Sequence, residues 1–501
     1  MPIALDTLCF DQAIEHFNEL VSELSSQESQ SWDHGALERH IHQSGTELLR
    51  RLFQGHLDVR YASEEYQKDV YGRDDEKRPH RRKQTQRKIE TLFGEVELKR
   101  VGYSTQKTNV SALYPSDGKL NLGPDKYSDE LRRRVAIEAS KVSFDETSQT
   151  IASTTGGSIG KRQCEEVTVK VAQDFDAFYA QRTIDRAVES DELLVITTDG
   201  KGIVMHSADL REATAKAAKK AEASKTRHTR LSPGQKRQRK RMATVASVYH
   251  VPTYVRQPED IIGDQRDPPP RPTISDKRVW ASVEQDAKTV IESAFSEAST
   301  RDPEQQREWV VLVDGEAHQL SSIKAIARQH KRTVTIVLDF IHVLEYVWKA
   351  AFCFFSSGTQ EAETWVQERA LRILLGQASD VAAGMRRSAT LQKLDSNVRE
   401  NVDKCADYLL KNRDYLHYDQ YLKNGYPIAS GVIEGACRHL VKDRMDITGA
   451  RWRLDRAEAV LKLRALRTSH DFDDYWEFHK AREFKRNHAD KFREPERLLG
   501  A

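Results

Sequence analysis

The spacing of hydrophobic positions changes twice along the chain, marking a helical first part, a central part with strands and a second helical part. Over residues 1–70, apolar side chains recur every three to four positions, as on the buried face of a helix. Alternation of apolar and polar residues at 89–101 predicts a β-hairpin that turns at Gly94. Helical spacing returns at 127–182. We therefore expect the first third of the chain to be mainly helical, with one hairpin.

The central segment alternates predicted strands and helices. Short apolar or alternating runs predict the strands, and longer runs with a three-to-four repeat predict the helices. The strands are expected at 193–198, 202–206, 242–255, 309–313 and 334–338, and the helices at 279–295 and 318–330. From 343 to about 423 the pattern is helical throughout. This order predicts the α/β class, with a core built on a sheet and a late helical insertion.

Composition narrows the classes of function. The 501 residues include 79 Lys and Arg and 77 Asp and Glu, a net charge of +2, so nucleic-acid contact must come from local clusters. The five cysteines form no CxxC pair, which argues against a zinc ribbon or a disulfide framework. The longest apolar run, 343–355, is too short and too charged to span a bilayer. The start has no basic segment before an apolar one, so we expect no signal peptide and a cytoplasmic location.

Two stretches concentrate basic residues. Residues 72–88 hold eight Lys or Arg and three acids, and form either a solvated linker or an arm that contacts the DNA backbone. Residues 211–241 hold twelve Lys or Arg and two acids between two predicted core strands. This second stretch is either a solvated insertion or a DNA clamp that ignores base sequence. Its candidate contact residues are Lys236, Arg237, Arg239, Lys240 and Arg241.

The helices of 127–182 follow the order of a helix-turn-helix, although a plain helical bundle has the same pattern. Ser143 and Glu146 predict a capping box at the start of the second helix. A pair of glycines breaks that helix, and Ser158 is expected to cap a long third helix that ends near residue 181. The neighbouring string TTGGSIGK is not a P-loop, because its first glycine and the Ser or Thr after Lys are missing. The residues expected to reach DNA are Lys161, Arg162 and Gln163.

Carboxylates follow two of the predicted strands. The runs VITTDG and VLVDGE place Asp199 and Asp314 directly after buried apolar residues, and a glycine follows each of them. Sites in α/β proteins form at such strand ends, and glycine lets the backbone turn sharply there. One Asp-Gly pair is commonly a simple turn. Two of them in one predicted sheet favour a functional site.

Glu434 is the third candidate carboxylate. It is expected one turn into a helix that begins near Ser430, among small residues that are unusual inside a helix. Close packing of that helix against a sheet or a ligand would offset the cost of the glycines. Clustered carboxylates repel one another unless divalent cations neutralise them, and hard oxygen ligands favour Mg²⁺ or Mn²⁺, here two ions. The basic residues that follow, candidate DNA contacts, are Lys442, Arg444 and Arg451.

Four motifs together resemble bacterial insertion-sequence transposases of the DDE class, close to the Kra type and more distantly similar to Mutator-like enzymes. They are TTDGKGI around Asp199, VLVDGE around Asp314, LDFIHVLEYVW around Asp339 and PIASGVIEGACRHLVKDRMDITGARW around Glu434, with LFGEVELKRVGY nearer the N-terminus. The resemblance spans roughly 85–480. It implies an RNase H-like catalytic core with a helical insertion, preceded by a mainly helical DNA-binding region, and it implies that Asp199, Asp314 and Glu434 are the catalytic metal ligands.

Asp339 and His342 match a D-x-x-H motif of the Mutator-like enzymes. The resemblance implies a role near the site, in which His342 positions a substrate phosphate or an unpaired base. The alternative is an ordinary buried pair in which His342 packs beside Asp339. Asp339 also ends a predicted strand, so it competes with Asp314 for the place of second ligand. The Asp-Gly context and the order of the motifs favour Asp314.

With this resemblance the chain divides into six expected segments. They are an N-terminal helical region with basic arm and hairpin (1–125), a helix-turn-helix-like DNA-binding region (126–190), the first part of the core (191–342, with the basic insertion 209–242), the helical insertion (343–423), the end of the core that carries Glu434 (424–475) and a charged C-terminal tail (476–501).

The expected function is DNA transposition: recognition of element ends, metal-dependent strand cleavage and strand transfer. The expected partners are element-end and target DNA and, from the resemblance alone, a second copy of the chain in synapsis at the nucleoid. Another RNase H-like metal-dependent nuclease is the first alternative. The second alternative is a DNA-binding regulator derived from a transposase, which would not need all three carboxylates.

Overall fold

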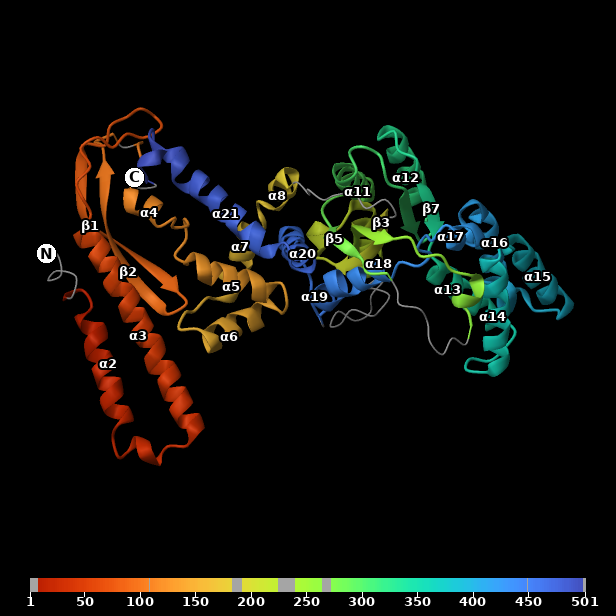
Figure 1. Cartoon of the computed structure of the whole chain (residues 1–501), viewed down its shortest axis with the longest axis horizontal. Coiled ribbons are helices and arrows are strands. Elements are labelled where there is room, and N and C mark those ends of the chain that lie inside the picture. Colours follow the sequence, from red (N-terminus) through yellow and green to blue (C-terminus); the bar gives the residue numbers. More distant parts are fainter. Residues whose placement is uncertain are drawn as a thin grey trace. The chain divides into compact units, whose positions relative to one another are not determined.

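The computed structural model describes residues 8–107, 109–182, 192–223, 239–263, 272–447 and 449–498. The chain folds into two compact units (Figure 1). Unit 1 comprises Met1–Gln181 with Asp471–Ala501, and unit 2 comprises Arg182–His470. Both units contain helices and strands, so the expected α/β class is confirmed at that level. None of the described helices is long and apolar enough to cross a membrane.

Unit 1 begins with a helical hairpin that lies on a two-stranded sheet. Helices α2 (Asp11–Leu24) and α3 (His34–Ala62) are antiparallel neighbours, and α3 packs on the strand β2 (Gly94–Ser104). Its partner β1 (His80–Thr91) starts nine residues before the predicted strand. The second half of the basic stretch 72–88 is therefore a paired strand, not a linker, because the ladder to β2 extends to the pair His80 and Ser104. A short helix, α4 (Pro115–Lys119), follows.

Four helices make up the expected helix-turn-helix region. They are α5 (Asp129–Ala139), α6 (Phe144–Thr154), α7 (Lys161–Ala172) and α8 (Phe175–Gln181). The capping box of Ser143 and Glu146 is confirmed. The expected cap at Ser158 is wrong: Gly160 is the N-cap of α7, because the backbone N–H and hydroxyl of Ser158 both donate to the Glu90 carboxylate. The predicted long third helix is two helices, α7 and α8.

The break between α7 and α8 places a buried carboxylate against the C-terminal helix α21 (Phe472–Asn487). Asp174, only 3% exposed, accepts hydrogen bonds from Arg486 and pairs with His479, 2.8 Å away. Burial alone raises the pKa of Asp174, but His479 and Arg486 outweigh it and hold this pKa well below its ordinary value. The charged segment expected as a tail from 476 thus continues α21 and belongs to unit 1.

Unit 2 is built on a five-stranded sheet. The strands β3 (Glu192–Val204), β4 (Lys240–Pro252), β5 (Ser275–Ser282), β6 (Trp309–Val313) and β7 (Thr335–Leu338) lie in the order β5-β4-β3-β6-β7. The first three pair antiparallel, whereas β6 and β7 run parallel to β3. Strand β6 is buried throughout, and β3 is buried at 192–198 and 203–204, as in a sheet that is covered on both faces.

Two predictions for this sheet are wrong. The predicted strands 193–198 and 202–206 are one strand, because β4 pairs with β3 without interruption from Glu192 to Val204. The helix predicted at 279–295 begins only at Ala287, as α11 (Ala287–Arg301) with Asp286 as N-cap. Residues 275–282 are the edge strand β5 instead, because pairing with β4 outweighs the helical spacing of their apolar side chains.

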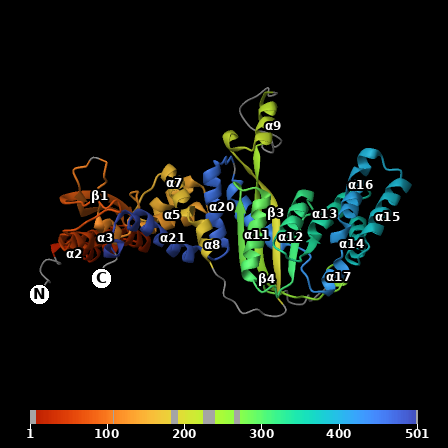
Figure 2. The same cartoon turned by 90° about the horizontal axis from the view of Figure 1, so that it is seen from above.

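Helices cover the sheet and extend the unit beyond β7 (Figures 1 and 2). The predicted helix at 318–330 is confirmed as α12 (Ala317–Gln329). The segment expected as a helical insertion contains α13 (Phe340–Ala351), α14 (Gln360–Leu374), α15 (Ala378–Leu391), α16 (Ser396–Lys411) and α17 (Tyr418–Lys423). The chain then returns to the sheet through α18 (Gly431–Ala436), the π-helical turn η5 (Cys437–Lys442), α19 (Asp443–Met445) and α20 (Leu454–Thr468), and the basic insertion contributes α9 (Glu212–Ala223).

The ion pairs of Asp174 generate a prediction for unit 1. Replacing Asp174 by Asn should lower the free energy of unfolding by about 3 kcal/mol, since it removes the buried carboxylate that binds the buried His479 and the half-exposed Arg486. The stabilisation by Asp174 is complete above the ordinary aspartate pKa of about 3.9 and is lost as the pH falls below it, because the folded-state pKa is depressed. Denaturant unfolding at neutral pH, and again near pH 3, measures both effects.

The matched control is Asp473→Asn, which removes an ion-paired carboxylate from α21 itself. Asp473 pairs with Arg133 but is 83% exposed, so its loss should change stability little. Equal effects of the two substitutions at neutral pH would show that Asp174 does not hold α21 in place.

Candidate active site

The parallel pairing of β3 with β6 sets the first two carboxylates side by side. Thr197 pairs with Leu312, so the same register carried two residues further aligns Asp199 with Asp314. Asp314 follows the last residue of β6, whereas Asp199 lies inside β3 at the point where its neighbour ends. The two segments are far apart in the chain, and the sheet alone brings these acids together.

The two glycines after these aspartates differ. Gly315 has φ +88°, and a Cβ there would meet the side chains of Leu338 and Asn412, so the expected sharp turn after Asp314 is confirmed. The Asp314 carbonyl accepts a hydrogen bond from the Tyr408 hydroxyl at 2.7 Å, which fixes the turn. After Asp199 the expected turn is wrong, because Gly200 continues β3 and pairs with Thr244.

Asp199 also contacts the segment that carries Glu434. One carboxylate oxygen of Asp199 accepts from the Gly200 N–H at 2.6 Å, and the other accepts from the Cys437 thiol at 3.0 Å. Cys437 lies three residues after Glu434, on the same side of the helical segment. Burial raises the pKa of the Cys437 thiol, and the Asp199 charge raises it further. Cys437 was not singled out in the sequence, where its spacing from Glu434 is the only signal.

Electrostatic coupling extends to all three carboxylates. Burial raises the pKa of Asp314, and the charge of Asp199 adds to that rise, while the Glu316 N–H and His342 act against it. Burial likewise raises the pKa of Glu434, with the charges of Asp339, Glu345 and Asp199 in the same direction and His342 opposed. The site is therefore an acidic cluster in which ionised carboxylates repel one another, with His342 close to two of them.

The donor set suits a hard divalent cation, since Asp199, Asp314 and Glu434 all offer carboxylate oxygens. The surroundings of Asp314 and Glu434 raise their pKa values, so neither is paired with a strong cation. Within the described part of the chain, no three Asp, Glu, His or Cys side chains converge closely enough to hold an ion as they stand. Asp199 would exchange its hydrogen bond from Cys437 for a metal ion. Carboxylate oxygens are suitable ligands for Mg²⁺ or Mn²⁺. To bind such an ion together, the three carboxylates would have to turn toward one another.

Asp339 has a different environment from the other acids. It is 1% exposed, and as N-cap of α13 one of its oxygens accepts from the Ile341 N–H at 2.8 Å. Its other oxygen accepts from both the N–H and the hydroxyl of Ser430. Both oxygens are thus occupied by the protein. This favours Asp314 over Asp339 as the second ligand and makes Asp339 the group that anchors the start of the Glu434 segment.

The Glu434 segment is only partly as expected. Ser430 is the N-cap residue of α18, but its side chain does not cap the helix, because it donates to Asp339 instead. The expected close packing at the glycines is wrong within the protein: a Cβ at Gly431 or Gly435 would meet no atom within 4 Å. Glu434 itself is exposed beside them. The open surface around Glu434 leaves room for a ligand to approach the backbone.

The candidate DNA contacts of unit 1 lie on the surface. Lys161 pairs with Asp145 and Arg162 with Glu166, and both cations are more than half exposed. Such exposed ion pairs are weak and exchange readily for phosphate. Gln163 is half-buried and lines a hollow at the start of α7.

The candidate contacts of unit 2 divide into three groups. Lys442 and Arg451 are exposed, but Arg444 is 2% exposed and lies over the Trp452 ring, so it is not placed to meet DNA. The guanidinium of Arg241 donates to three backbone carbonyls, which marks a structural role, while Arg239 and Lys240 are half-buried at the start of β4. Lys236 and Arg237 lie outside the described residues.

Comparison with known proteins gives no independent assignment. No protein-family model matches this chain. No curated protein matches it either.

Proposed function

We propose that this protein is a DDE-type DNA transposase that binds the ends of an insertion sequence and catalyses metal-dependent strand cleavage and strand transfer. The observation that carries the proposal is the alignment of Asp199 with Asp314 across the β3–β6 pair, with the charge of Asp199 acting on both Asp314 and Glu434. The strand order, with three antiparallel strands followed by two strands parallel to the first, supports an RNase H-like core.

In this proposal each residue has a defined task. Asp199, Asp314 and Glu434 hold a pair of Mg²⁺ or Mn²⁺ ions, which supply activation of a water or 3′-hydroxyl and stabilisation of the leaving oxygen. His342 interacts electrostatically with Asp314 and Glu434, and in this proposal it positions the substrate phosphate. Asp339 holds Ser430 and thereby the start of α18. The open backbone at Gly431 and Gly435 lets the DNA strand approach Glu434.

The two alternative functions make different demands on this site. A regulator that only binds DNA gains nothing from a site in which burial and the charge of Asp199 raise the pKa values of Asp314 and Glu434, so the cluster argues against it. Another metal-dependent nuclease would use the same cluster. Such a nuclease would cleave DNA that carries the inverted repeats but would not join the freed 3′-end to a target. Inverted repeats bracketed by short direct repeats around the reading frame would favour the transposase.

The carboxylate cluster gives the first test. Asp199→Asn, Asp314→Asn and Glu434→Gln should each abolish cleavage and strand transfer on DNA that carries the flanking inverted repeats, since the amides lose the charge that a divalent ion needs. Asp314→Asn should also raise the melting temperature without metal, because ionising this half-buried carboxylate at neutral pH destabilises the fold when its pKa is raised. Cleavage assays and melting curves with and without Mg²⁺ measure both effects.

The control is Asp339→Asn. Since the protein itself occupies both Asp339 oxygens, this change should lower the melting temperature, while Mg²⁺ still raises it as in the wild type. Cleavage at near wild-type rate by any of the first three variants removes that residue from the metal ligands. If Asp314→Asn cleaves and Asp339→Asn does not respond to Mg²⁺, the second ligand is Asp339.

The open glycine next to Glu434 gives the second test. Gly435→Ala should raise the free energy of unfolding by about 0.5–1 kcal/mol, because alanine favours the helix and meets no neighbouring atom. Cleavage should nevertheless fall, since the added methyl group occupies the space through which DNA reaches Glu434. Gly384→Ala, in α15, is the matched control: its Cβ also meets no atom within 4 Å, so it should stabilise without lowering activity. Unchanged cleavage by Gly435→Ala would mean that DNA does not approach here.

The start of α7 gives the third test. Arg162→Ala combined with Gln163→Ala in the full chain should reduce the preference for element-end over random DNA by about tenfold, as expected for loss of side chains that read bases. Binding isotherms on the two DNAs measure this ratio. The control is Arg39→Ala with Gln43→Ala on α3, an Arg and Gln pair on an exposed surface of unit 1 away from α7. Equal losses on both DNAs would assign Arg162 and Gln163 to phosphate contacts.

A further inference from the structure

Three tyrosine hydroxyls of the helical insertion reach backbone carbonyls at the edge of the sheet in unit 2. The donors and acceptors are Tyr408 to Asp314 (2.7 Å), Tyr418 to Leu338 (2.8 Å) and Tyr421 to Ile336 (3.3 Å). The donors lie on α16 and α17, and the acceptors lie in β7 or directly after β6. The insertion is thus fastened to the two strands after which Asp314 and Asp339 follow.

The two bonds to β7 complete the edge of the sheet. Strand β7 pairs only with β6 among the described strands, so the carbonyls of its alternate residues point away from the sheet and need other donors. The Asp339 N–H donates toward β6, to the Val313 carbonyl, so the carbonyls of Leu338 and Ile336 point to the outer side. Both tyrosines of α17 are buried and supply the donors. Their role is therefore to hold the fold together.

The bond to Asp314 acts at a different place, past the end of strand pairing. Asp199 is still paired within β3 and β4, whereas the ladder between β6 and β7 ends one residue before Asp314. A Cβ at Gly315 would lie 3.4 Å from the Tyr408 ring and 3.3 Å from the Asn412 side chain, so the turn after Asp314 packs against α16. The Asn412 amide donates to the Tyr408 carbonyl at 3.0 Å. The end of α16 thus holds the Asp314 backbone where the sheet no longer does.

The ring of Tyr408 links the same turn to the helix that carries His342. It stacks on Tyr346 of α13, with ring centroids 4.0 Å apart and planes 10° apart. Tyr346 lies four residues after His342, so both are on one face of α13. His342 in turn acts electrostatically on Asp314 and Glu434. One aromatic stack therefore fixes the helix of His342 against the turn of Asp314.

We infer that Tyr408 is a positioning residue for Asp314, through which the helical insertion holds this carboxylate level with Asp199. The inference deepens the proposed function and rests on it, because positioning matters only if Asp314 is a metal ligand. Tyr408 acts through the Asp314 backbone and through Tyr346, and not through the ion itself. Residues that orient metal ligands typically change metal affinity by roughly 10- to 100-fold when they are replaced.

The hydroxyl is tested by Tyr408→Phe in the full chain, which keeps the ring that stacks on Tyr346. The dissociation constant for Mn²⁺, measured by calorimetric titration without DNA, should rise by about tenfold or more. Binding to element-end DNA should stay as in the wild type. A higher Mn²⁺ concentration should restore cleavage by Tyr408→Phe, whereas Asp314→Asn should stay inactive at every concentration, because it lacks the ligand itself.

The matched control is Tyr421→Phe, which removes the same kind of hydrogen bond at Ile336, within β7. Both substitutions should lower the melting temperature, but Tyr421→Phe should bind Mn²⁺ as the wild type does. Tyr346→Ala is a second variant that keeps the Tyr408 hydroxyl and removes the stack. It should also weaken Mn²⁺ binding, and Tyr346→Phe should restore it.

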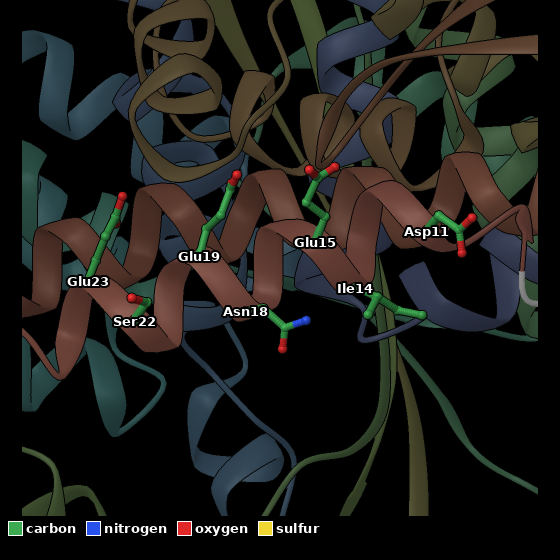
Figure 3. A pocket seen from close by; sticks show the side chains of 7 residues that line it. All are labelled: Asp11, Ile14, Glu15, Asn18, Glu19, Ser22 and Glu23. Carbon is green, nitrogen blue, oxygen red and sulfur yellow. The ribbon is translucent and has the colours of Figure 1, made fainter.

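A row of acids on unit 1 needs its own control in the Mn²⁺ titrations. Figure 3 shows Asp11, Glu15, Glu19 and Glu23 along α2, around a shallow hollow on its surface. All four are exposed, so ions held there are weakly bound. Glu15→Gln combined with Glu19→Gln should therefore leave the tight Mn²⁺ binding unchanged.

The inference and the proposed function fail in different ways. Equal Mn²⁺ affinities of Tyr408→Phe and Tyr421→Phe would overturn the inference, and so would Mn²⁺ binding by the wild type that Asp314→Asn does not weaken. If Tyr408→Phe does not fold, equal affinities of Tyr346→Ala and Tyr346→Phe would overturn it instead. A wild type whose Mn²⁺ binding depends on Tyr408 but which cleaves no DNA with the inverted repeats would exclude the transposase and leave the positioning role in place.

Discussion

The candidate site depends on the parallel pairing of β3 with β6. The two strands are paired from Leu194 with Trp309 to Thr197 with Leu312. The same register, carried two residues further, holds Asp199 and Asp314 at one level of the sheet. The core strand residues around them are fully buried, and a slip of one residue would turn their side chains to the other face. Core packing and site geometry are therefore set by the same register.

Glu434, the third carboxylate, lies on a helical segment that is held to the sheet by polar contacts and not by strand pairing. Asp339 ends β7, caps α13 and holds Ser430, so one buried carboxylate links the sheet, the start of the helical insertion and the start of α18. Asp199 reaches the same segment through Cys437. Burial of this carboxylate is tolerated because both of its oxygens accept hydrogen bonds from the protein. Glu434 stays exposed, while the backbone that carries it is held at both ends.

Buried charged side chains also hold distant segments together in unit 1, where carboxylates pair with cationic side chains. Helix α21, from the end of the chain, enters the unit through buried ion pairs: Arg132, 1% exposed, donates to Glu483, and Asp174 binds Arg486. Burial raises the pKa of Glu483, but the charge of Arg132 and the hydrogen bonds from Arg132 and Arg486 together outweigh it and lower this pKa below its ordinary value. A fragment that ended before α21 would leave these charges buried without partners.

The sequence by itself determined the local features: the capping box at Ser143, the helices after β7, the apolar runs of β6 and β7, and three carboxylates of a kind that suits divalent cations. Only tertiary structure decided that β3 continues past Asp199, that 275–282 is a strand and that Ser158 does not cap α7, since pairing with β4 and the Glu90 carboxylate supply those constraints from distant parts of the chain. It also separated Asp339 from Asp314. Both acids follow apolar strands in the sequence, and only the folded chain shows that Ser430 and Ile341 occupy one of them while the other faces Asp199.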